Sequence, residues 1–279
     1  MRLHGAAAGV AATTMLGAAC GGGAATTTKP ASAQVINTTY PSASLHSNRN
    51  VMVLLPPGYQ SSRRYPVVEF LHGIPGGPDE MIGTVNMNVV SNQSKTPFIA
   101  VAPDGNGPMV TDSEFANTTR QPMGTVTGPE LRSWVDSHYS TDRTWYVTGL
   151  STGGFGAPYL PTLSPGAYTA ACPVSGAFDA RGPGQPFSDD QAFVGQPASV
   201  RQAASPILHV SANGPRTLVV TGSSDTLSFD PSNRYVAAMR AVGQPNKLIV
   251  EPGGHEDRVW RAGNRQCIRY FFAASGISG

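Results

Sequence analysis

Seven short apolar runs recur along the chain, and none of them shows a strict alternation of apolar and polar residues. They cover residues 51–55, 66–71, 97–102, 144–148, 168–174, 217–221 and 247–250. A strand with one face in water alternates apolar and polar side chains, whereas a strand that is buried on both faces is apolar nearly throughout. The runs therefore predict the strands of a mostly parallel sheet that is covered by helices on both faces.

Segments with helical periodicity lie between these runs. Residues 129–136 place Leu131, Trp134 and Val135 on one face, and a proline and an acid stand at the start of the segment. Two further helix candidates cover residues 233–242 and 259–274. This repeated alternation of strand and helix predicts a doubly wound α/β fold, in which ligands bind at the carboxyl ends of the strands.

Two segments break the regular pattern. Residues 177–215 are rich in Gly, Pro, Gln and Ser and are too long for an ordinary connection, so they predict an irregular cap or substrate loop. The helix expected after residue 151 contains Pro158 and Pro161, and a proline inside a helix costs about 3 kcal/mol. We therefore expect that helix to be short or kinked near Pro158.

Composition limits the classes of partner. The chain has 279 residues, enough for one large α/β domain or two small ones, and only 13% of them are charged. The net charge is +2 and the sequence shows no basic cluster, so nothing indicates nucleic acid as a partner. We assign residues 35–279 to one α/β domain, because the preceding residues differ in composition.

Residues 1–34 predict an export segment followed by a flexible tether. An alanine-rich, weakly apolar stretch at residues 5–16 is too short for a stable membrane span. Leu16 to Cys20, with three glycines after it, resembles a lipoprotein processing site, although Leu16 is one residue further from the cysteine than usual. Lipidation of Cys20 would tether the protein to a membrane, whereas cleavage after the Ala-Ser-Ala at residues 31–33 would secrete it. The sequence leaves open which of the two sites is used, if either.

Export would bring the cysteines into an oxidising compartment. Once Cys20 is set aside, Cys172 and Cys267 remain as an even pair. Cys172 lies in an expected strand, and Cys267 lies in the expected C-terminal helix. The sequence leaves two alternatives open, a disulfide or two buried thiols.

The clearest chemical motif is Gly-Leu-Ser-Thr-Gly at residues 149–153. A serine on a sharp turn between a strand and a helix projects its hydroxyl from the sheet edge, and side chains at the two glycine positions would collide across that turn. The pentad alone is a weak signal in a chain with 32 glycines. Its position after a strand and before small residues makes Ser151 the candidate nucleophile.

A serine hydroxyl becomes a nucleophile when a histidine takes its proton and a carboxylate orients that histidine. In α/β-hydrolases these residues follow in the order serine, acid, histidine. Of the two histidines after Ser151, His209 precedes every acid at a strand end and is assigned a structural role. His255 lies in a glycine-rich loop after the last strand and is therefore the candidate base.

The acid should follow the penultimate strand. Asp225 stands four residues after the end of the run at 217–221. Asp230 is its competitor, but it is followed by a proline and resembles the start of a helix. We therefore select Asp225.

Two backbone N–H groups must stabilise the oxyanion that develops during attack on an ester. One is expected from Thr152, the residue after the nucleophile. The other is expected from the loop after the run at 66–71, where Pro75 has no N–H and Ile74 is the candidate donor. His72 is expected to brace this loop.

These motifs together resemble the putative-esterase group of the α/β-hydrolase superfamily, which holds esterase-D-like carboxylesterases, feruloyl esterases and secreted mycolyltransferases. The matching pieces are Leu54-Leu55-Pro56-Pro57-Gly58-Tyr59, Leu71-His72-Gly73, Ala102-Pro103-Asp104-Gly105, residues 149–157, and Gly253-Gly254-His255 with Trp260 five residues later. The resemblance covers residues 35–275 and implies Ser151, Asp225 and His255 as a catalytic triad. The prolines after the serine and the irregular cap depart from the family, and they affect the acyl pocket rather than the triad.

The predicted function is that of an exported serine esterase, which hydrolyses carboxylic esters through an acyl-enzyme on Ser151. An acyltransferase, in which a sugar hydroxyl replaces water, is the alternative enzyme, and a hydrolase-fold binding protein without activity is the alternative outside catalysis. No metal-binding or nucleotide-binding motif is visible, so no cofactor is predicted. The substrate would be a small-molecule, lipid or sugar ester. Three aromatic residues are the candidates for its acyl pocket: Phe187, Phe193 and Phe229.

Overall fold

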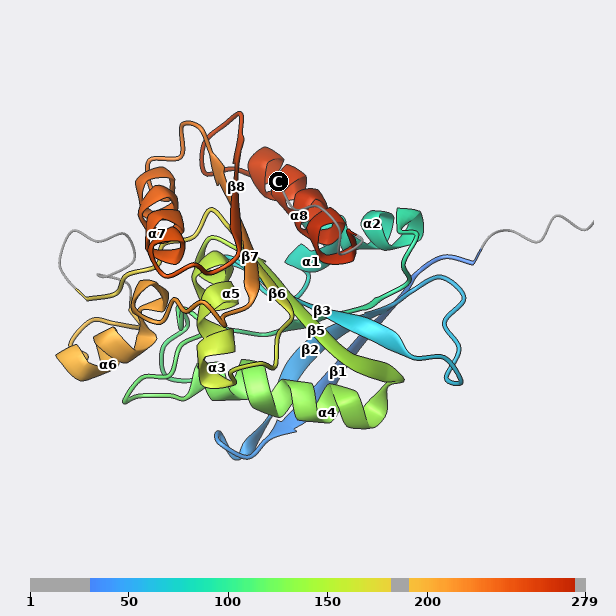
Figure 1. The fold of residues 1–279 in the computed structure, drawn as a ribbon. Helices are drawn as coiled ribbons and strands as arrows, with labels where there is room; N and C mark the ends of the chain where they lie inside the picture. Colours follow the sequence, from blue (N-terminus) through green and yellow to red (C-terminus); the bar gives the residue numbers. More distant parts are fainter. Residues whose placement is uncertain (1–30, 182–190, 274–279) are drawn as a thin grey trace, which may run out of the picture. The chain divides into compact units, whose positions relative to one another are not determined.

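The computed structural model describes residues 31–181 and 191–273, and these residues form an eight-stranded mixed sheet with helices on both faces (Figure 1). The strands lie side by side in the order β1-β2-β4-β3-β5-β6-β7-β8. Their bounds are β1 Gln34–Ser42, β2 Ser47–Leu55, β3 Tyr65–Leu71, β4 Ile99–Pro103, β5 Thr141–Leu150, β6 Ala170–Val174, β7 Arg216–Gly222 and β8 Asn246–Glu251. Each of the seven apolar runs corresponds to a strand, from β2 to β8.

The direction of the strands changes at one side of the sheet. β1 pairs antiparallel with β2, and β2 pairs antiparallel with β4, whereas all other neighbours are parallel. The apolar pattern does not predict β1, because this edge strand has few buried side chains and mixes polar with apolar residues. The carboxyl ends of the parallel strands share one edge of the sheet, where a site is expected.

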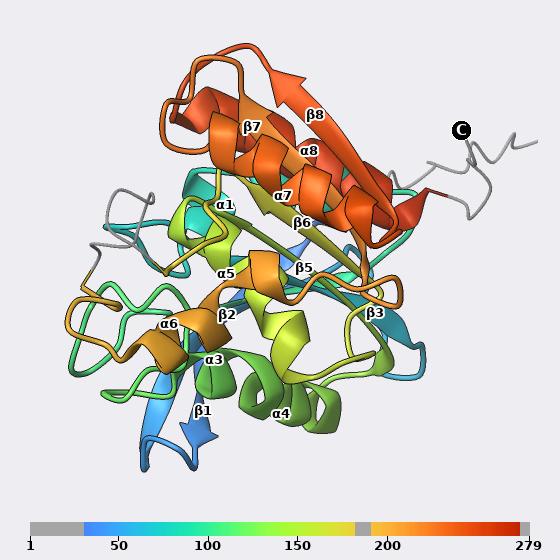
Figure 2. The ribbon, with the colours of Figure 1, turned by 60° about the vertical axis from the view of Figure 1, so that its left-hand side comes forward.

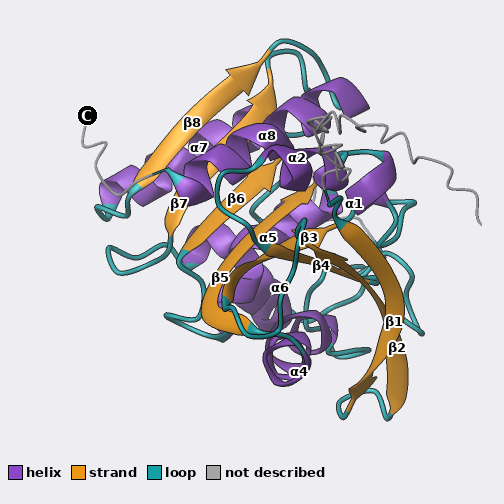
Figure 3. Ribbon diagram, turned by 90° about the vertical axis from the view of Figure 1, so that its right-hand side faces the viewer, coloured by secondary structure: helices purple, strands orange, loops and turns teal. Residues whose placement is uncertain are grey.

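The helices form a layer on each face of the sheet. Their bounds are α1 Glu80–Gly83, α2 Met87–Gln93, α3 Met123–Thr125, α4 Leu131–His138, α5 Thr152–Leu163, α6 Ala198–Ala204, α7 Phe229–Ala241 and α8 Asp257–Phe272. A π-helical turn, Val126–Glu130, joins α3 to α4, and a 3-10 turn, Pro206–Leu208, follows α6. Figure 3 shows the twisted sheet among these helices.

Alternate side chains of the strands enter two cores. On one face, Val147 of β5 belongs to the core that α4 and α5 complete. On the other face, Tyr146 belongs to the core that α1, α2 and α8 complete. β7 is covered in the same way, since Val219 packs with α7 and Val220 packs with α8. Figure 2 shows these two helices beside β7. Strands buried on both faces explain the continuous apolar runs.

The helix after Ser151 is longer than predicted. α5 runs for 12 residues through Pro158 and Pro161 and ends before Ser164. Ten of those residues are buried, so tertiary packing outweighs the local cost of the prolines. The prediction that this helix is short was wrong, and its alternative, a kink near Pro158, stays a prediction.

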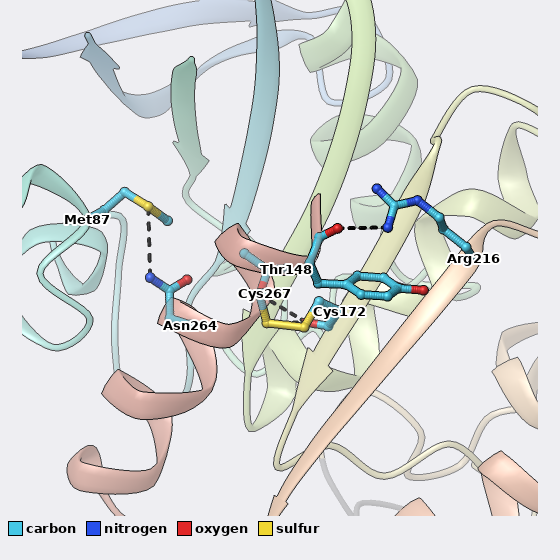
Figure 4. The surroundings of a disulfide bond; sticks show 7 residues. Met87, Thr148, Cys172, Arg216, Asn264 and Cys267 are labelled. Carbon is cyan, nitrogen blue, oxygen red and sulfur yellow. Dashed lines mark hydrogen bonds between the residues drawn. A yellow bond between two sulfur atoms is a disulfide. The ribbon is translucent and has the colours of Figure 1, made fainter. Parts of the chain in front are cut away.

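A disulfide joins Cys172 in β6 to Cys267 in α8, with the two sulfur atoms 2.04 Å apart (Figure 4). Both side chains are fully buried. The bond spans 95 residues, and the chain-entropy model assigns about 4 to 5 kcal/mol to the closure of such a loop. Nearby, the Asn264 amide of α8 donates to the Met87 sulfur of α2 at 3.8 Å. The last helix is thus fastened both to the sheet and to its neighbouring helix.

Some predictions concern residues that the structure does not describe. Residues 1–30 of the predicted export segment and tether (residues 1–34), with Cys20 among them, lie outside the described residues, and so does Phe187. The predicted cap loop is described except for residues 182–190, and its described part contains α6 and a 3-10 turn, so it is more regular than expected. Among the helices that the structure describes, none combines the length and the apolar character that a membrane span requires.

Candidate active site

Ser151 occupies the turn between β5 and α5, at the carboxyl edge of the parallel strands. Its φ of 54° is a left-handed conformation, which costs a residue other than glycine about 1 to 3 kcal/mol. The surrounding backbone maintains it, because the Ser151 N–H donates to the Val174 carbonyl at 3.0 Å. A Cβ atom at Gly149 would collide with the Gly153 carbonyl, and one at Gly153 would collide with the Leu71 carbonyl. Close backbone packing thus requires both glycines of the pentad.

The structure brings Ser151, His255 and Asp225 together from three separate loops. His255 lies between β8 and α8, and its Nε2 is 2.9 Å from the Ser151 hydroxyl oxygen. Its Nδ1 is 2.9 Å from Oδ2 of Asp225, which lies between β7 and α7. The three side chains form one chain of hydrogen bonds. Ser151 and Asp225 are buried, and His255 is partly exposed.

Asp225 carries a negative charge although it is almost fully buried. Burial tends to raise the pKa of this carboxyl, but hydrogen bonds from His255 and Ser228 outweigh burial and lower the pKa to about 2. The Ser228 hydroxyl donates to Oδ2 at 2.7 Å, and the N–H groups of Leu227 and Ser228 donate to Oδ1, each at 3.1 Å. An ionised carboxylate only accepts, so the proton of His255 is on Nδ1 and the lone pair of Nε2 faces Ser151.

Trp260 supports the other side of the histidine ring. It lies in the first turns of α8, and its ring packs edge-on against His255 with 5.1 Å between the centroids and 84° between the planes. The sequence motif records only the spacing of these two residues. The structure explains this spacing, because one helical turn after the loop places the Trp260 indole beside the His255 imidazole. The indole thereby limits the rotation of the imidazole.

The competing candidates lie apart from this constellation. Asp230 is exposed in the first turn of α7. His209 lines a pocket of about 360 Å³ with Thr217, near the amino end of β7 and therefore at the opposite edge of the sheet. Among the residues that the structure describes, no group of three or more His, Cys, Asp or Glu side chains is arranged to hold a metal ion.

The two expected oxyanion donors line the same small cavity. Thr152 is the first residue of α5, where N–H groups have no acceptor within the helix. Ile74 lies in the loop after β3, and both residues border a cavity of about 10 Å³, the size of a single water. The neighbouring Gly73 N–H is already bound to Oε2 of Glu80 at 2.7 Å, so the loop offers the N–H of Ile74 rather than that of Gly73.

His72 connects the loop after β3 to the loop after β4. Its Nε2 accepts from the Gly105 N–H at 2.9 Å, so its Nδ1 carries the proton and donates to the Gly73 carbonyl at 2.7 Å. Burial is the main cause that lowers the pKa of His72, which keeps the ring neutral and this tautomer in place. The ring also packs edge-on against Phe115. His72 therefore has the geometry of a brace.

Of the three predicted acyl-pocket residues, the structure describes Phe193 and Phe229. Phe193 is fully buried against Phe155 in the core, with ring centroids 5.6 Å apart, so it is part of the fold and not of an open pocket. Phe229 begins α7 and is partly buried. Two further residues were not predicted from the sequence. Ser228 donates a hydrogen bond to Asp225, and Glu80 accepts one from the loop after β3. An Asp followed three residues later by a Ser was a visible signal for the first, but nothing local indicated the second.

Comparison with known protein families gives a match over most of the chain. Residues 42–265 match the family model described as "Putative esterase". An uncharacterized protein of Corynebacterium glutamicum is 24% identical over 243 residues, which is 80% of this chain. The chain spans only 57% of the length of that curated relative.

Solved structures show the same fold at low identity. A ferulic acid esterase superposes with a TM-score of 0.73 at 20% identity, covering 86% of this chain and 98% of its own. The fluorophosphonate-binding serine hydrolase F of Staphylococcus aureus gives 0.74 at 19% identity, with coverage of 86% and 98%. The S-formylglutathione hydrolase of the same organism gives 0.71 at 18%, with coverage of 85% and 98%. The predicted α/β-hydrolase fold is confirmed, and the chain belongs to the esterase family that matches residues 42–265.

Proposed function

We propose that this protein is an exported serine esterase that hydrolyses carboxylic esters through an acyl-enzyme on Ser151. The observation that carries the proposal is the continuous hydrogen-bonded chain from the Ser151 hydroxyl through His255 to the ionised Asp225, with 2.9 Å at both steps. The fold does not require this series of hydrogen bonds around a buried serine. The serine hydroxyl requires it in order to lose its proton during attack on a carbonyl.

The reaction follows from these contacts. Ser151 Oγ attacks the ester carbonyl carbon while Nε2 of His255 takes the hydroxyl proton, and the resulting imidazolium is stabilised by Asp225. Collapse of the tetrahedral intermediate breaks the ester C–O bond, and His255 returns the proton to the leaving alcohol. Water then attacks the acyl-enzyme with His255 again as the base, which releases the acid and restores Ser151.

We assign the backbone N–H groups of Ile74 and Thr152 as the donors to the negative oxygen of the intermediate. Thr152 directly follows Ser151, and it borders one small cavity together with Ile74. Glu80 and His72 hold the loop that presents Ile74, so the donors are in place before the substrate arrives. Such preorganisation is the usual source of the largest rate gain in acyl transfer.

The substrate class is a carboxylic ester, and two arguments bear on its nature. The similar structures include an esterase of ferulic acid and a hydrolase of S-formylglutathione, so this fold accepts acyl groups of very different size. The export signal predicted in residues 1–34 would place the enzyme outside the cytoplasm, where the buried Cys172–Cys267 disulfide is stable. A series of p-nitrophenyl esters of increasing acyl length measures the pocket directly.

The proposal is tested by covalent labelling with a fluorophosphonate probe. The wild type should gain one probe mass, and Ser151→Ala should gain none and lose nearly all esterase activity. Ser224→Ala is the matched control, because Ser224 is exposed beside the site and bonds through its backbone, so this variant should label as the wild type does. An unlabelled wild type would indicate a binding protein, and labelling of Ser151→Ala would disprove the assigned nucleophile.

Hydrolysis and acyl transfer share the acyl-enzyme and differ in the group that attacks it. In an esterase, added sugar acceptor leaves the yield of free acid unchanged. A sugar ester that accumulates at the expense of free acid would reassign the reaction to transfer while leaving the triad in place.

A further inference from the structure

A groove outside the active site combines three cations with an apolar wall. It lies between α8 and the end of α2, which are neighbours in Figures 1 and 3, and its volume is about 410 Å³. Lys95, Arg265 and Arg269 line it and are exposed. Its apolar lining comes from three other side chains: Val90, Ile268 and Phe272. We call these six residues the basic groove.

The described residues supply no acidic partner to the basic groove. Among them, no residue that lines the groove is an aspartate or glutamate, and no salt bridge involves its three cations. Arg265 and Arg269 are four residues apart and therefore share a face of α8. The only acid of that helix is Asp257 at its opposite end. The sequence shows no basic cluster, because Lys95 is far from the two arginines along the chain.

The chain enters the domain beside this groove. The backbone N–H of Ala33, which precedes β1, donates to the Asn92 side chain of α2 at 2.8 Å. Ala33 also packs against the same core as Val90 and Phe272. The residues before it are the ones whose composition predicts export, with a lipid tether at Cys20 as one of the alternatives that the sequence leaves open. A domain tethered at this point would hold the basic groove close to that membrane.

We propose that the basic groove is an interaction surface for the anionic phospholipids of a membrane. Lys95, Arg265 and Arg269 would contact the lipid phosphates, and the apolar wall would face the upper part of the acyl chains. The argument rests on charge complementarity and on the position where the chain enters, and it draws on the proposed export for the presence of the membrane. It does not depend on the triad.

This orientation would turn the active site away from the lipid. α8 begins two residues after His255 and ends at Phe272 in the groove, and its 16 residues rise about 24 Å. With the groove on the membrane, Ser151 faces the space beyond the surface. The docked enzyme would therefore act on esters that approach from solution or from surrounding envelope material, and not on acyl chains embedded in the same bilayer.

The test is vesicle co-sedimentation of the full chain carrying Cys20→Ser, which removes any lipid anchor. One set of vesicles is pure phosphatidylcholine, and the other is an equimolar mixture with phosphatidylglycerol. We expect binding to the anionic set that weakens as salt is added. The combined variant K95Q, R265Q and R269Q should bind on the order of a hundredfold more weakly, since each cation near an anionic surface contributes about fivefold.

The matched control removes the same net charge elsewhere, with R234Q and R240Q on α7 and K247Q on β8, all exposed. It should keep most of the binding. Equal loss in both triple variants, or equal binding to the two vesicle sets, would overturn the proposal. If the groove variant has a lowered melting temperature, the single variants K95Q and R269Q are measured instead, and each should bind anionic vesicles about fivefold more weakly than the wild type. Hydrolysis of a soluble p-nitrophenyl ester should be unchanged in every groove variant, which separates this proposal from the proposed function.

Discussion

Two buried carboxyl groups of this protein respond to burial in opposite ways. Asp225 at the sheet edge has a pKa lowered to about 2, and its hydrogen bonds outweigh the effect of burial. Glu69 in the middle of β3 is fully buried, and burial raises its pKa to about 8 against the opposing influences of the Tyr168 hydrogen bond and the Arg132 charge. Loss of water is common to both, so the number and direction of hydrogen-bond donors decide the sign.

The two carboxyl groups differ in the number of hydrogen-bond donors around them and in the parts of the fold that supply those donors. Asp225 receives four donors, from Leu227, Ser228 and His255, within one turn and one facing loop. Glu69 receives a hydrogen bond from the Tyr168 hydroxyl at 2.7 Å, and its other oxygen is buried without a partner. A site that needs a charged group supplies donors from loops, whereas the regular sheet around Glu69 has already used its own donors in strand pairing.

Removal of the charge at Asp225 should have the largest effect. Asp225→Asn should lower kcat by about 10⁴-fold, because an amide allows the wrong tautomer of His255. Asp230→Asn is the control and should behave as the wild type, since Asp230 is exposed in α7. The measurement is steady-state hydrolysis beside a thermal melt. A larger loss from Asp230→Asn would show that the acid was assigned wrongly.

Glu69→Gln should have the next largest effect, on stability. A raised folded pKa means that Glu69 stabilises the fold fully below its unfolded value of 4.5, and this contribution is lost as pH rises through about 8. The loss amounts to about 5 kcal/mol at most. Denaturant melts of both proteins from pH 4 to 9 should therefore show Glu69→Gln gaining stability over the wild type. Parallel stability curves would contradict the raised pKa of Glu69.

The stability that the Asp225 carboxylate contributes depends on pH in the opposite direction. A lowered folded pKa means that its contribution is present above its unfolded value of 3.8 and is lost as pH falls through about 2. Ser228→Ala removes the 2.7 Å hydrogen bond to Oδ2 and should therefore raise the pKa of Asp225. The expected loss is about 1.5 to 3 kcal/mol in the free energy of unfolding and on the order of tenfold in kcat. Ser228→Thr, which keeps the hydroxyl, should restore the acid stability and most of the activity. Equal behaviour of the two variants would exclude this role for the hydroxyl.

The smallest effect is expected at Tyr168. Tyr168→Phe removes the hydroxyl that donates to Glu69 and should cost about 1 kcal/mol near pH 5, and more at pH 8, where the carboxylate needs a donor. A double-mutant cycle with Glu69→Gln isolates the coupling. The pH-dependent part should vanish when Glu69→Gln is already present. Its persistence in the double variant would assign the effect to packing of the Tyr168 ring.

The meeting of Ser151, Asp225 and His255 at one edge of the sheet could be predicted from the sequence, because each residue follows an apolar run and parallel strands bring such positions to one edge. Their order along the chain came from the pattern of α/β-hydrolases. Partners that meet only in three dimensions could not be read. Glu69 stands out as an acid in an apolar strand, but Tyr168, which bonds to it, is 99 residues away. The basic groove was missed for the same reason. Glu80 lies only seven residues from its partner Gly73 and was missed because no local motif indicates that contact. β1 was missed because an exposed edge strand leaves no continuous apolar run.

The order of the strands also determines how slowly the chain can fold. β1 and β2 meet through a short turn, whereas the register of β3 and β5 joins Leu71 to Gly149 across nearly eighty residues. The entropy of closing such loops is lost before the parallel pairs form, so their assembly is slow compared with that of the hairpin. Until those pairs exist, the apolar α5 and the unpaired central strands remain accessible to neighbouring chains. The nascent protein therefore depends on protection from self-association for longer than its size alone would suggest.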